Sequence, residues 1–145
     1  MTPRPVRLGI VGLGAVAQAV HLPLLARLPD RFAISAICDL SRSLVDSLGA
    51  RYGVPASART TDPTDLLARD DLDGFLVLTS GSHAPLAAAA LETGRPVFVE
   101  KPLAYTVAEA DRLAEIARAS GGRLQLGYMK LYDPAVVAAR RILRP

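Results

Sequence analysis

Residues 6–17 read VRLGIVGLGAVA, an apolar run that ends in the pattern G-x-G-x-x-A and continues into a helical pattern. This is the pattern of the first strand, turn and helix of a dinucleotide-binding fold. Gly12 permits a tight turn, Gly14 lets the backbone approach a pyrophosphate, and Ala17 lets the helix pack on the strand. Free N–H groups and the helix dipole favour an anion there, so Ala15 and Val16 are also expected at the cofactor.

The next apolar run supplies a second signal for the same site. Asp39 ends this run, where its carboxylate can accept hydrogen bonds from the hydroxyls of an adenosine ribose. The carboxylate favours NAD and repels the 2′-phosphate of NADP, although Arg42 nearby leaves NADP possible. The alternative is that Asp39 only forms the turn before the following helix.

Composition limits the class of protein. The chain has 145 residues, half of them hydrophobic and 21% charged, which fits one domain with a core of its own, residues 1–145. No apolar run approaches the roughly 18 residues of a membrane span, and residues 1–5 have no apolar stretch typical of a secretory signal. A single cysteine, Cys38, inside an apolar run suggests a buried thiol in a reducing cytoplasm.

Charge and residue counts exclude other functions. The net charge is +3, but the basic residues are scattered rather than clustered, so nucleic-acid binding is not expected. Two histidines and one cysteine do not suggest a metal site, and no local motif supports a Ser-His-Asp or Cys-His arrangement. Lysine occurs only twice, at Lys101 and Lys130, against fifteen arginines, so each lysine stands out as a place where an ammonium group is needed.

Strand and helix patterns alternate along the whole chain, which predicts an α/β fold with a doubly wound parallel sheet of six strands in the order 3-2-1-4-5-6, covered by helices on both faces. The expected strands are 6–11, 32–38, 59–61, 73–79, 96–100 and 123–128. The expected helices are 15–28, disturbed by Pro23, then 42–52 after a Ser41 cap, 62–69 with Asp62 as its cap, 83–93, 106–120 with a capping box, and 133–143.

Ligands of such sheets bind beyond the carboxyl ends of the strands, where the strand order reverses. Strand four ends at Thr79 and Ser80, and His83 follows one helical turn later; all three are candidate cofactor contacts. Strand five ends at Glu100 and Lys101, and the lysine could face the nicotinamide ribose and a substrate oxygen. The alternatives are an ordinary exposed ion pair between Glu100 and Lys101, and a capping role for His83.

His21 is followed by Leu22-Pro23, which indicates the end of a structural helix rather than a site.

These segments together carry a resemblance. The first glycine-rich stretch with residues 21–23, Cys38-Asp39, Thr79 to His83 and residues 99–104, VEKPLA, resemble the nucleotide-binding half of the glucose-fructose oxidoreductase, inositol dehydrogenase and rhizopine-catabolism (Gfo/Idh/MocA) family. The E-K-P segment is its most specific mark. The similarity covers nearly the whole chain, although Ser80 and Gly81 replace the family's usual Pro-Asn.

The resemblance implies that Lys101 orients the nicotinamide and takes part in catalysis on sugar or cyclitol hydroxyls. It also implies a second, substrate-binding domain, which these 145 residues do not provide. Residues from about 128 to 145 correspond to the strand and helix that lead toward it.

Three functions therefore remain open. The first is the cofactor-binding part of an NAD-dependent oxidoreductase. The second is a non-catalytic dinucleotide-binding sensor or regulatory subunit, and the third is non-redox chemistry with Lys101 as base or imine-forming amine.

The final helix bears on partners. Its apolar residues Val136, Val137, Ile142 and Leu143 either pack on the chain's own sheet or seek a partner, which predicts a homodimer or a heteromeric complex.

Overall fold

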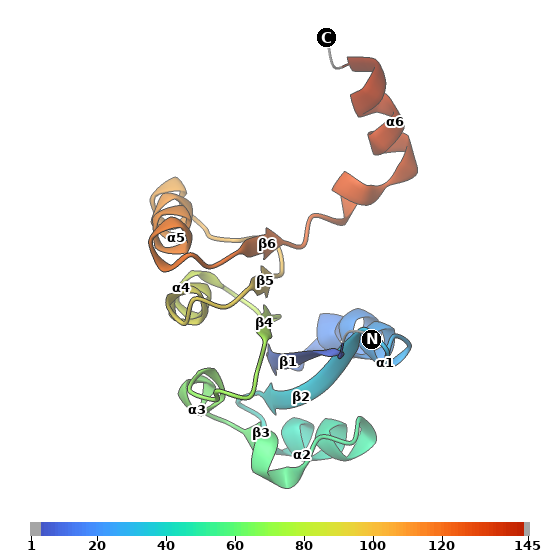
Figure 1. Cartoon of the computed structure of the whole chain (residues 1–145), viewed down its shortest axis with the longest axis vertical. Coiled ribbons are helices and arrows are strands. Elements are labelled where there is room, and N and C mark those ends of the chain that lie inside the picture. Colours follow the sequence, from blue (N-terminus) through green and yellow to red (C-terminus); the bar gives the residue numbers. More distant parts are fainter. Residues whose placement is uncertain (1–3, 144–145) are drawn as a thin grey trace.

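The computed structural model describes residues 4–143, and its six strands form one parallel sheet in the order β3-β2-β1-β4-β5-β6 (Figure 1). The predicted strand order is confirmed. The strands are β1 (Val6–Val11), β2 (Phe32–Cys38), β3 (Arg59–Thr60), β4 (Gly74–Val77), β5 (Val97–Val99) and β6 (Leu124–Leu126). The main helices are α1 (Leu22–Ala26), α2 (Arg42–Arg51), α3 (Pro63–Leu67), α4 (Ala84–Glu92), α5 (Val107–Ser120) and α6 (Pro134–Leu143).

The central strand β1 organises the sheet. It pairs with β2 along its full length, from Val6 opposite Phe32 to Val11 opposite Cys38, and with β4 on its other side. Its last residues are buried, as expected for a parallel strand that is covered on both faces. The core of the domain lies around this strand, with Ile10, Leu13 and Phe75 almost completely enclosed.

Several predicted boundaries were too generous. β4 is shorter than the predicted strand 73–79, β5 than 96–100 and β6 than 123–128. Flanking residues such as Asp73 and Leu78 still donate a backbone N–H to β1, but the regular strand does not extend to them. The first helix ends at Ala26 rather than Leu28, and its middle is a wider π-helical turn, η1 (Ala17–His21). Pro23 follows this turn and has no N–H for the regular helical bond, so the helix widens where that bond is lost.

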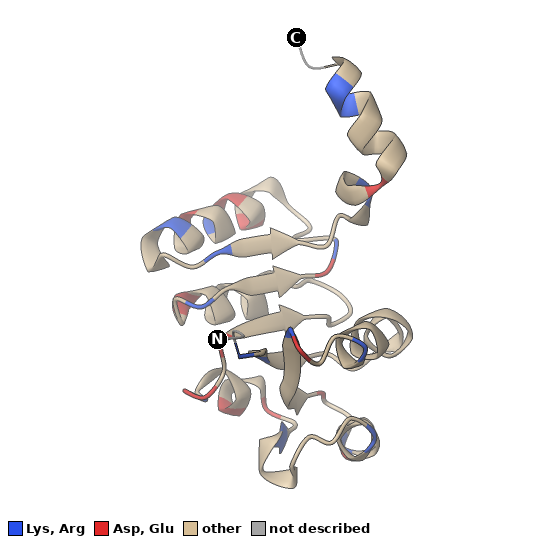
Figure 2. Cartoon of the chain, turned by 45° about the vertical axis from the view of Figure 1, so that its right-hand side comes forward, with Lys and Arg blue, Asp and Glu red and all other residues tan. Residues whose placement is uncertain are grey.

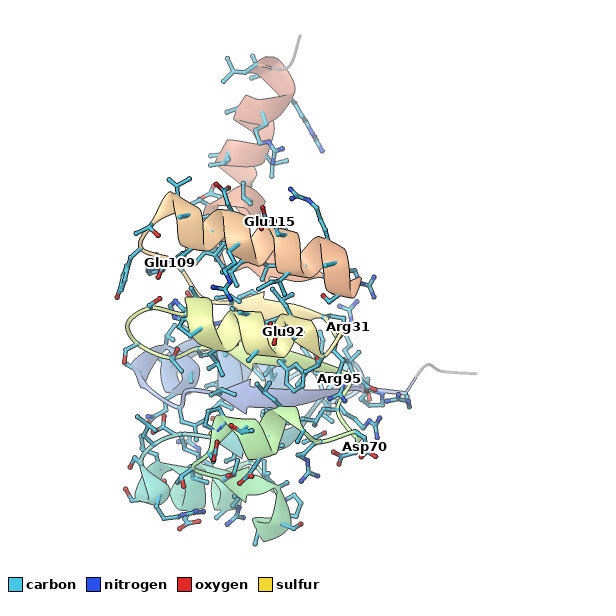
Figure 3. The ribbon with its side chains drawn as sticks, turned by 90° about the vertical axis from the view of Figure 1, so that its left-hand side faces the viewer. Arg31, Asp70, Glu92, Arg95, Glu109 and Glu115 are labelled. Carbon is cyan, nitrogen blue, oxygen red and sulfur yellow. The ribbon has the colours of Figure 1, made fainter. Side chains whose placement is uncertain are left out.

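The helix starts follow the predicted capping chemistry. Ser41 and Asp62 accept hydrogen bonds from backbone N–H groups of α2 and α3. Thr106 and Glu109 form the predicted reciprocal capping box of α5. Figure 3 shows Glu109 near the start of α5, on the face of the molecule where α3, α4 and α5 lie side by side. These caps fix where each helix begins relative to the strand before it.

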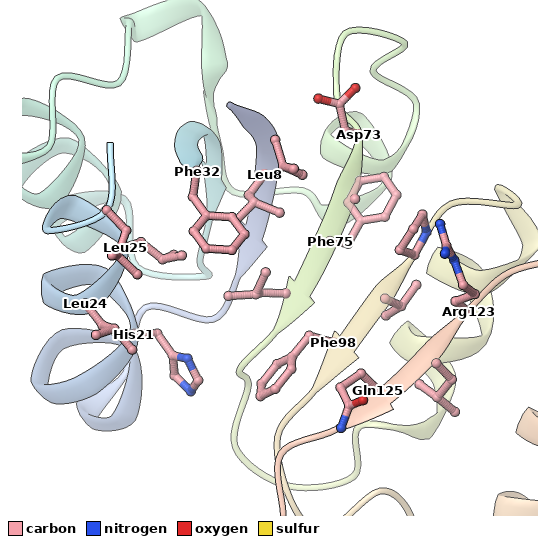
Figure 4. Close-up of a pocket in the computed structure, with 17 residues that line it drawn as sticks. Leu8, His21, Leu24, Leu25, Phe32, Asp73, Phe75, Phe98, Arg123 and Gln125 are labelled. Atoms are coloured by element: carbon pink, nitrogen blue, oxygen red, sulfur yellow. The ribbon is translucent and has the colours of Figure 1, made fainter. Parts of the chain in front are cut away.

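The two faces of the sheet are covered unequally. α1 and α2 lie on one face, over β1 to β3, and α3, α4 and α5 lie on the other (Figure 1). No helix among residues 4–143 covers the first face of β4, β5 and β6. A hollow of about 770 Å³ remains there beside α1, lined by apolar side chains that include Leu25, Leu76 and Phe98 (Figure 4).

α6 projects away from the sheet on the side of this open face (Figure 1). It contacts the preceding turn η3 (Met129–Tyr132), and none of its residues is buried. Ile142 and Leu143 are about four-fifths exposed, at 82% and 79%. Its basic residues, Arg140 and Arg141, lie in the last turn (Figure 2). The alternative that this helix packs on its own sheet is therefore not what the structure adopts.

Asp73 ties the start of β4 to the start of β1. Its carboxylate accepts two hydrogen bonds from the Arg4 guanidinium, at 2.6 and 2.8 Å, and further ones from the side chain and the backbone N–H of Arg7. Hydrogen bonds from Arg4 and then from Arg7 hold the pKa of Asp73 well below its usual range. The carboxylate therefore stabilises the folded state at every pH at which it is ionised in both the folded and the unfolded protein.

We expect Asp73→Asn to lower the midpoint of urea unfolding at pH 7, because the variant loses the charged partner of two arginines. Since the folded pKa is depressed, the contribution is present above the unfolded value of about 3.9 and is lost as the pH falls below it. The difference between the two proteins should therefore shrink between about pH 4 and pH 2. A difference that stays constant over this range would contradict the assignment.

Candidate functional site

The turn after β1 is built from backbone atoms at close range. Gly12 has a φ of +93° and donates its N–H to the carbonyl oxygen of Cys38 at 2.9 Å. A Cβ at this position would lie 2.5 Å from the backbone nitrogen of Thr79, at the end of β4. Gly12 is therefore required both by the conformation and by the approach of the next strand. At Gly14 a Cβ would meet nothing within 4 Å, so open space lies above this residue.

Asp39 connects this turn to β2. One carboxylate oxygen accepts the N–H of Leu13 at 2.7 Å, and the other accepts the N–H of Ser41 at 2.9 Å. The turn-forming role considered for Asp39 is thus present. A carboxylate oxygen can accept more than one hydrogen bond, so both oxygens retain acceptor capacity toward a ligand.

A hollow of about 630 Å³ opens between these elements, a volume typical of sites for small molecules and cofactors. Seven of the predicted contact residues border it: Gly12, Gly14, Ala15, Val16, Asp39, Thr79 and Ser80. The sequence analysis missed the apolar part of its wall, which includes Leu40, Pro63, Pro85 and Leu86. Two signals could have found these residues: Leu40 directly follows Asp39, and Pro85 and Leu86 lie in the first turn of the helix after strand four.

Four other predicted residues do not border the hollow. Arg42 is exposed on α2, with its guanidinium 3.5 Å from the hydroxyl of Thr61. His83, Glu100 and Lys101 lie near the ends of β4 and β5.

His83 is 2% exposed, and each of its ring nitrogens lies within hydrogen-bonding distance of a carbonyl oxygen. Nδ1 lies 2.6 Å from the carbonyl oxygen of Pro102, and Nε2 lies 2.7 Å from that of Thr79. The ring therefore joins the turn after β5 to the end of β4. The sequence alternative, a side-chain cap of the following helix, is not observed at this residue.

Glu100 is also buried, at 9% exposure. Its Oε1 is 2.9 Å from Nε2 of His21, and its Oε2 accepts the backbone N–H of Lys101 at 3.0 Å. The alternative of an ion pair with the Lys101 ammonium is not observed. The partner of the carboxylate is His21, which was predicted to lie at a structural helix end. A buried carboxylate needs a hydrogen-bonding or charged partner. Because the chain has only two histidines, this requirement could have suggested His21 as a partner of Glu100 from the sequence.

Lys101 is exposed, and the part of the chain that the structure describes gives its ammonium group no hydrogen bond or ion pair. The peptide bond to Pro102 is cis. The amine is thus accessible, at the carboxyl edge of the sheet.

Cys38 lies at the end of β2 and borders the hollow from beneath. Burial, followed by the nearby carboxylates of Asp39, Asp62 and Asp65, raises the pKa of its thiol to about 11. The thiol therefore stays protonated near neutral pH and is a poor nucleophile, as expected for a residue of the core.

Residues 4–143 contain neither a metal-binding cluster nor a membrane-spanning helix. No group of three or more His, Cys, Asp or Glu side chains is arranged to hold a metal ion. None of the described helices is long and apolar enough to cross a membrane.

A parallel sheet in this order, with a glycine turn, an open helix start and a carboxylate meeting at the reversal of strand order, defines a dinucleotide-binding Rossmann domain. The free space above Gly14 and the acceptor capacity of Asp39 fit a pyrophosphate and a ribose. Residues 6–128 match the model of the oxidoreductase family with an NAD-binding Rossmann fold, GFO_IDH_MocA. The chain belongs to this family, as its NAD(P)-binding domain.

Curated relatives agree with this assignment. The chain is 36% identical over 147 residues to an inositol 2-dehydrogenase of Paenarthrobacter aurescens, covering 97% of this chain and 42% of the relative. It is 37% identical over 134 residues to one of Saccharopolyspora erythraea, covering 88% and 37%. The chain thus spans about two fifths of the length of these relatives.

Solved structures give the same coverage. A 3-ketoreductase from Actinomadura kijaniata, determined with NADP, is 30% identical with a TM-score of 0.84, over 97% of this chain and 44% of that one. A dehydrogenase from Bordetella pertussis, determined with NADH and UDP-GlcNAcA, is 25% identical with a TM-score of 0.86, over 97% and 42%.

Proposed function

We propose that the chain binds a nicotinamide dinucleotide in the hollow beside Gly12, Gly14 and Asp39, as the cofactor domain of an enzyme that oxidises or reduces a sugar or cyclitol. The observation that carries the proposal is the convergence of the glycine turn, the start of a helix and one carboxylate around a hollow at the reversal of strand order. The pyrophosphate would lie over Gly14 and the start of the helix, with the adenosine ribose on Asp39. The family match and the relatives' names support the substrate class.

When bound, the nicotinamide ring supplies the hydride acceptor or donor. The chain's own contribution is to orient the ring and to place an amine at the sheet edge. Lys101 is the proposed catalytic residue, where its ammonium group can bind a substrate oxygen and exchange a proton with it. Glu100 and His83 are proposed to act on the cofactor through the turn that carries Lys101, since both side chains are held by protein partners.

Asp39 favours NAD over NADP, because its carboxylate would meet the 2′-phosphate of NADP at the ribose. NADP remains possible through Arg42, which is exposed on the next helix. The core position of Cys38 supports a reducing, cytoplasmic location.

Gly14→Ala separates cofactor binding from folding. A Cβ at this position meets no protein atom within 4 Å, so the variant should unfold at the same temperature as the unaltered protein. It should bind NAD about ten- to a hundredfold more weakly, because the methyl group occupies the approach of the pyrophosphate and each factor of ten corresponds to about 1.4 kcal/mol. Isothermal titration calorimetry with NAD measures the change.

Gly12→Ala is the contrasting variant. Its positive φ and the contact with Thr79 should lower the unfolding temperature as well as the affinity for NAD. Unchanged NAD affinity in Gly14→Ala would exclude a pyrophosphate at this position.

Catalysis by Lys101 is tested with the full product of the reading frame that encodes residues 1–145. With NAD and a panel of cyclitols and sugars, Lys101→Ala should lower turnover by about a hundredfold or more while NAD still binds, because it loses acid–base catalysis. Nicotinamide absorbance measures the rate.

Lys130→Ala is the matched control, since it removes the chain's other lysine from an exposed pair with Asp133. Equal turnover in the two variants would contradict the role of Lys101. Tight NAD binding without turnover on any substrate would favour the alternative, a dinucleotide-binding sensor or regulatory subunit.

We also propose that α6 mediates association with a second copy or with a different protein. The support is its exposed apolar residues and the open apolar face of β4 to β6 on the same side of the domain. Parallel sheets are normally covered on both faces.

Light scattering of residues 1–145 should therefore give a mass above the 15.3 kDa of one chain. Ile142→Asp should reduce this mass toward that of the monomer, because it places a charge in the apolar contact. Arg141→Glu, a charge change at a neighbouring position, is the control for general effects of charge. A monomer at all concentrations, with no protein bound from its own host, would contradict the proposal.

A further inference from the structure

The chain has two histidines, and both hold the turn that carries Lys101. His21 bonds to the residue before the lysine, and His83 bonds to the residue after it. They come from opposite sides: His21 from the wide turn of the first helix, and His83 from the start of α4.

On the side before Lys101, Glu100 connects His21 to the backbone of the lysine. Its backbone N–H donates to the carbonyl oxygen of Val77 at 2.9 Å, which fixes the end of β5 on β4. One oxygen of its carboxylate faces His21 and the other accepts the N–H of Lys101, so the side chain is bonded on both oxygens. The His21 ring is itself set by an edge-to-face contact with Phe98, at 5.3 Å between centroids.

Gly127 leaves the space for this arrangement. A Cβ there would lie 2.9 Å from the Phe98 ring and 3.3 Å from Oε1 of Glu100. The exit of β6 therefore passes directly beside the buried carboxylate. A side chain at position 127 would therefore crowd both the Phe98 ring and the Glu100 carboxylate.

On the side after Lys101, His83 ties Pro102 to Thr79, and Thr79 borders the proposed cofactor site. The contact with Pro102 is the one that acts on the turn at Lys101, and the contact with Thr79 places the ring beside it.

We infer that His21 and His83 are positioning residues for Lys101: acting through Glu100 and Pro102, they fix the backbone on both sides of the lysine so that its amine faces the nicotinamide end of the bound cofactor. This inference rests on the proposed function and adds to it the residues that orient the proposed catalytic amine. Neither ring touches the cofactor site directly, since neither borders the hollow.

The two histidines can be tested with opposite replacements. A glutamine amide places its nitrogen near the position of a histidine Nε2, and an asparagine amide near that of Nδ1. His21 bonds to Glu100 through Nε2, so His21→Gln keeps the donor and His21→Asn loses it. His83 bonds to Pro102 through Nδ1, so His83→Asn keeps the donor and His83→Gln loses it.

The readout is the Lys101 amine itself. Reductive methylation with ¹³C-formaldehyde labels both lysines, and Lys130→Arg assigns their NMR signals. In the unaltered protein, saturating NAD should shift the Lys101 signal and leave that of Lys130 in place. This shift should be lost in His21→Asn and His83→Gln and kept in His21→Gln and His83→Asn, with NAD affinity within about tenfold throughout.

The expected result is that glutamine preserves the Lys101 shift at position 21 and asparagine preserves it at position 83. This opposite preference distinguishes positioning from packing, because a purely structural role would favour the same amide at both positions. A Lys101 shift that persists in all four variants, or the same order at both sites, overturns the inference. A variant that fails to fold counts against it at that position, since a core role would then explain the contact. Failure of the unaltered protein to bind NAD is a different result, which overturns the proposed function.

Discussion

The contact between the Gly12 turn and the backbone of Thr79 is the constraint on which the site depends. The segment after β1 and the segment after β4 approach so closely here that position 12 has no space for a side chain. Without this approach, the hollow would lose the wall that separates the helix start from the loop after β4. Asp39 contacts the same turn from the opposite side, where it accepts the N–H of Leu13. The segments that follow β2 and β4 therefore both contact the short turn after β1.

A second group of polar residues lies at the same edge of the sheet. Its side chains hold the turn at Lys101 in place and do not border the proposed cofactor site. Glu100 and His83 are the two polar or charged residues that are buried in the described part of the chain. Each of them bonds to the turn at Lys101 or Pro102. Burial of such groups is tolerated only with complete hydrogen bonding, which makes their positions narrowly defined. The backbone of Lys101 is held in place by these hydrogen bonds, while its side chain remains exposed to solvent.

Much of the fold was accessible from sequence because local signals agreed with one another. The glycine pattern, the alternation of apolar runs and the caps at Ser41, Asp62 and Thr106 each indicated the same order of elements, which the structure confirms. Strand ends were less predictable, because an apolar residue such as Leu78 continues the hydrophobic pattern beyond the last residue of the strand. Seven residues of the candidate site were predicted from the glycine turn, the helix start and the ends of the second and fourth strands. The partnership of His21 and Glu100 was not, because it joins residues 79 positions apart by a contact with no local pattern.

The wide turn at Ala17–His21 links the helix geometry to the edge of the sheet. In a regular α-helix each residue advances the side-chain direction by about 100°, so the number of residues in this turn determines where the His21 ring points. Loss of one residue here would restore a tighter winding and rotate the imidazole away from the carboxylate. The length of this segment is therefore under a steric constraint independent of its composition, and descendants of this sequence can exchange its outward side chains more freely than they can lengthen or shorten it.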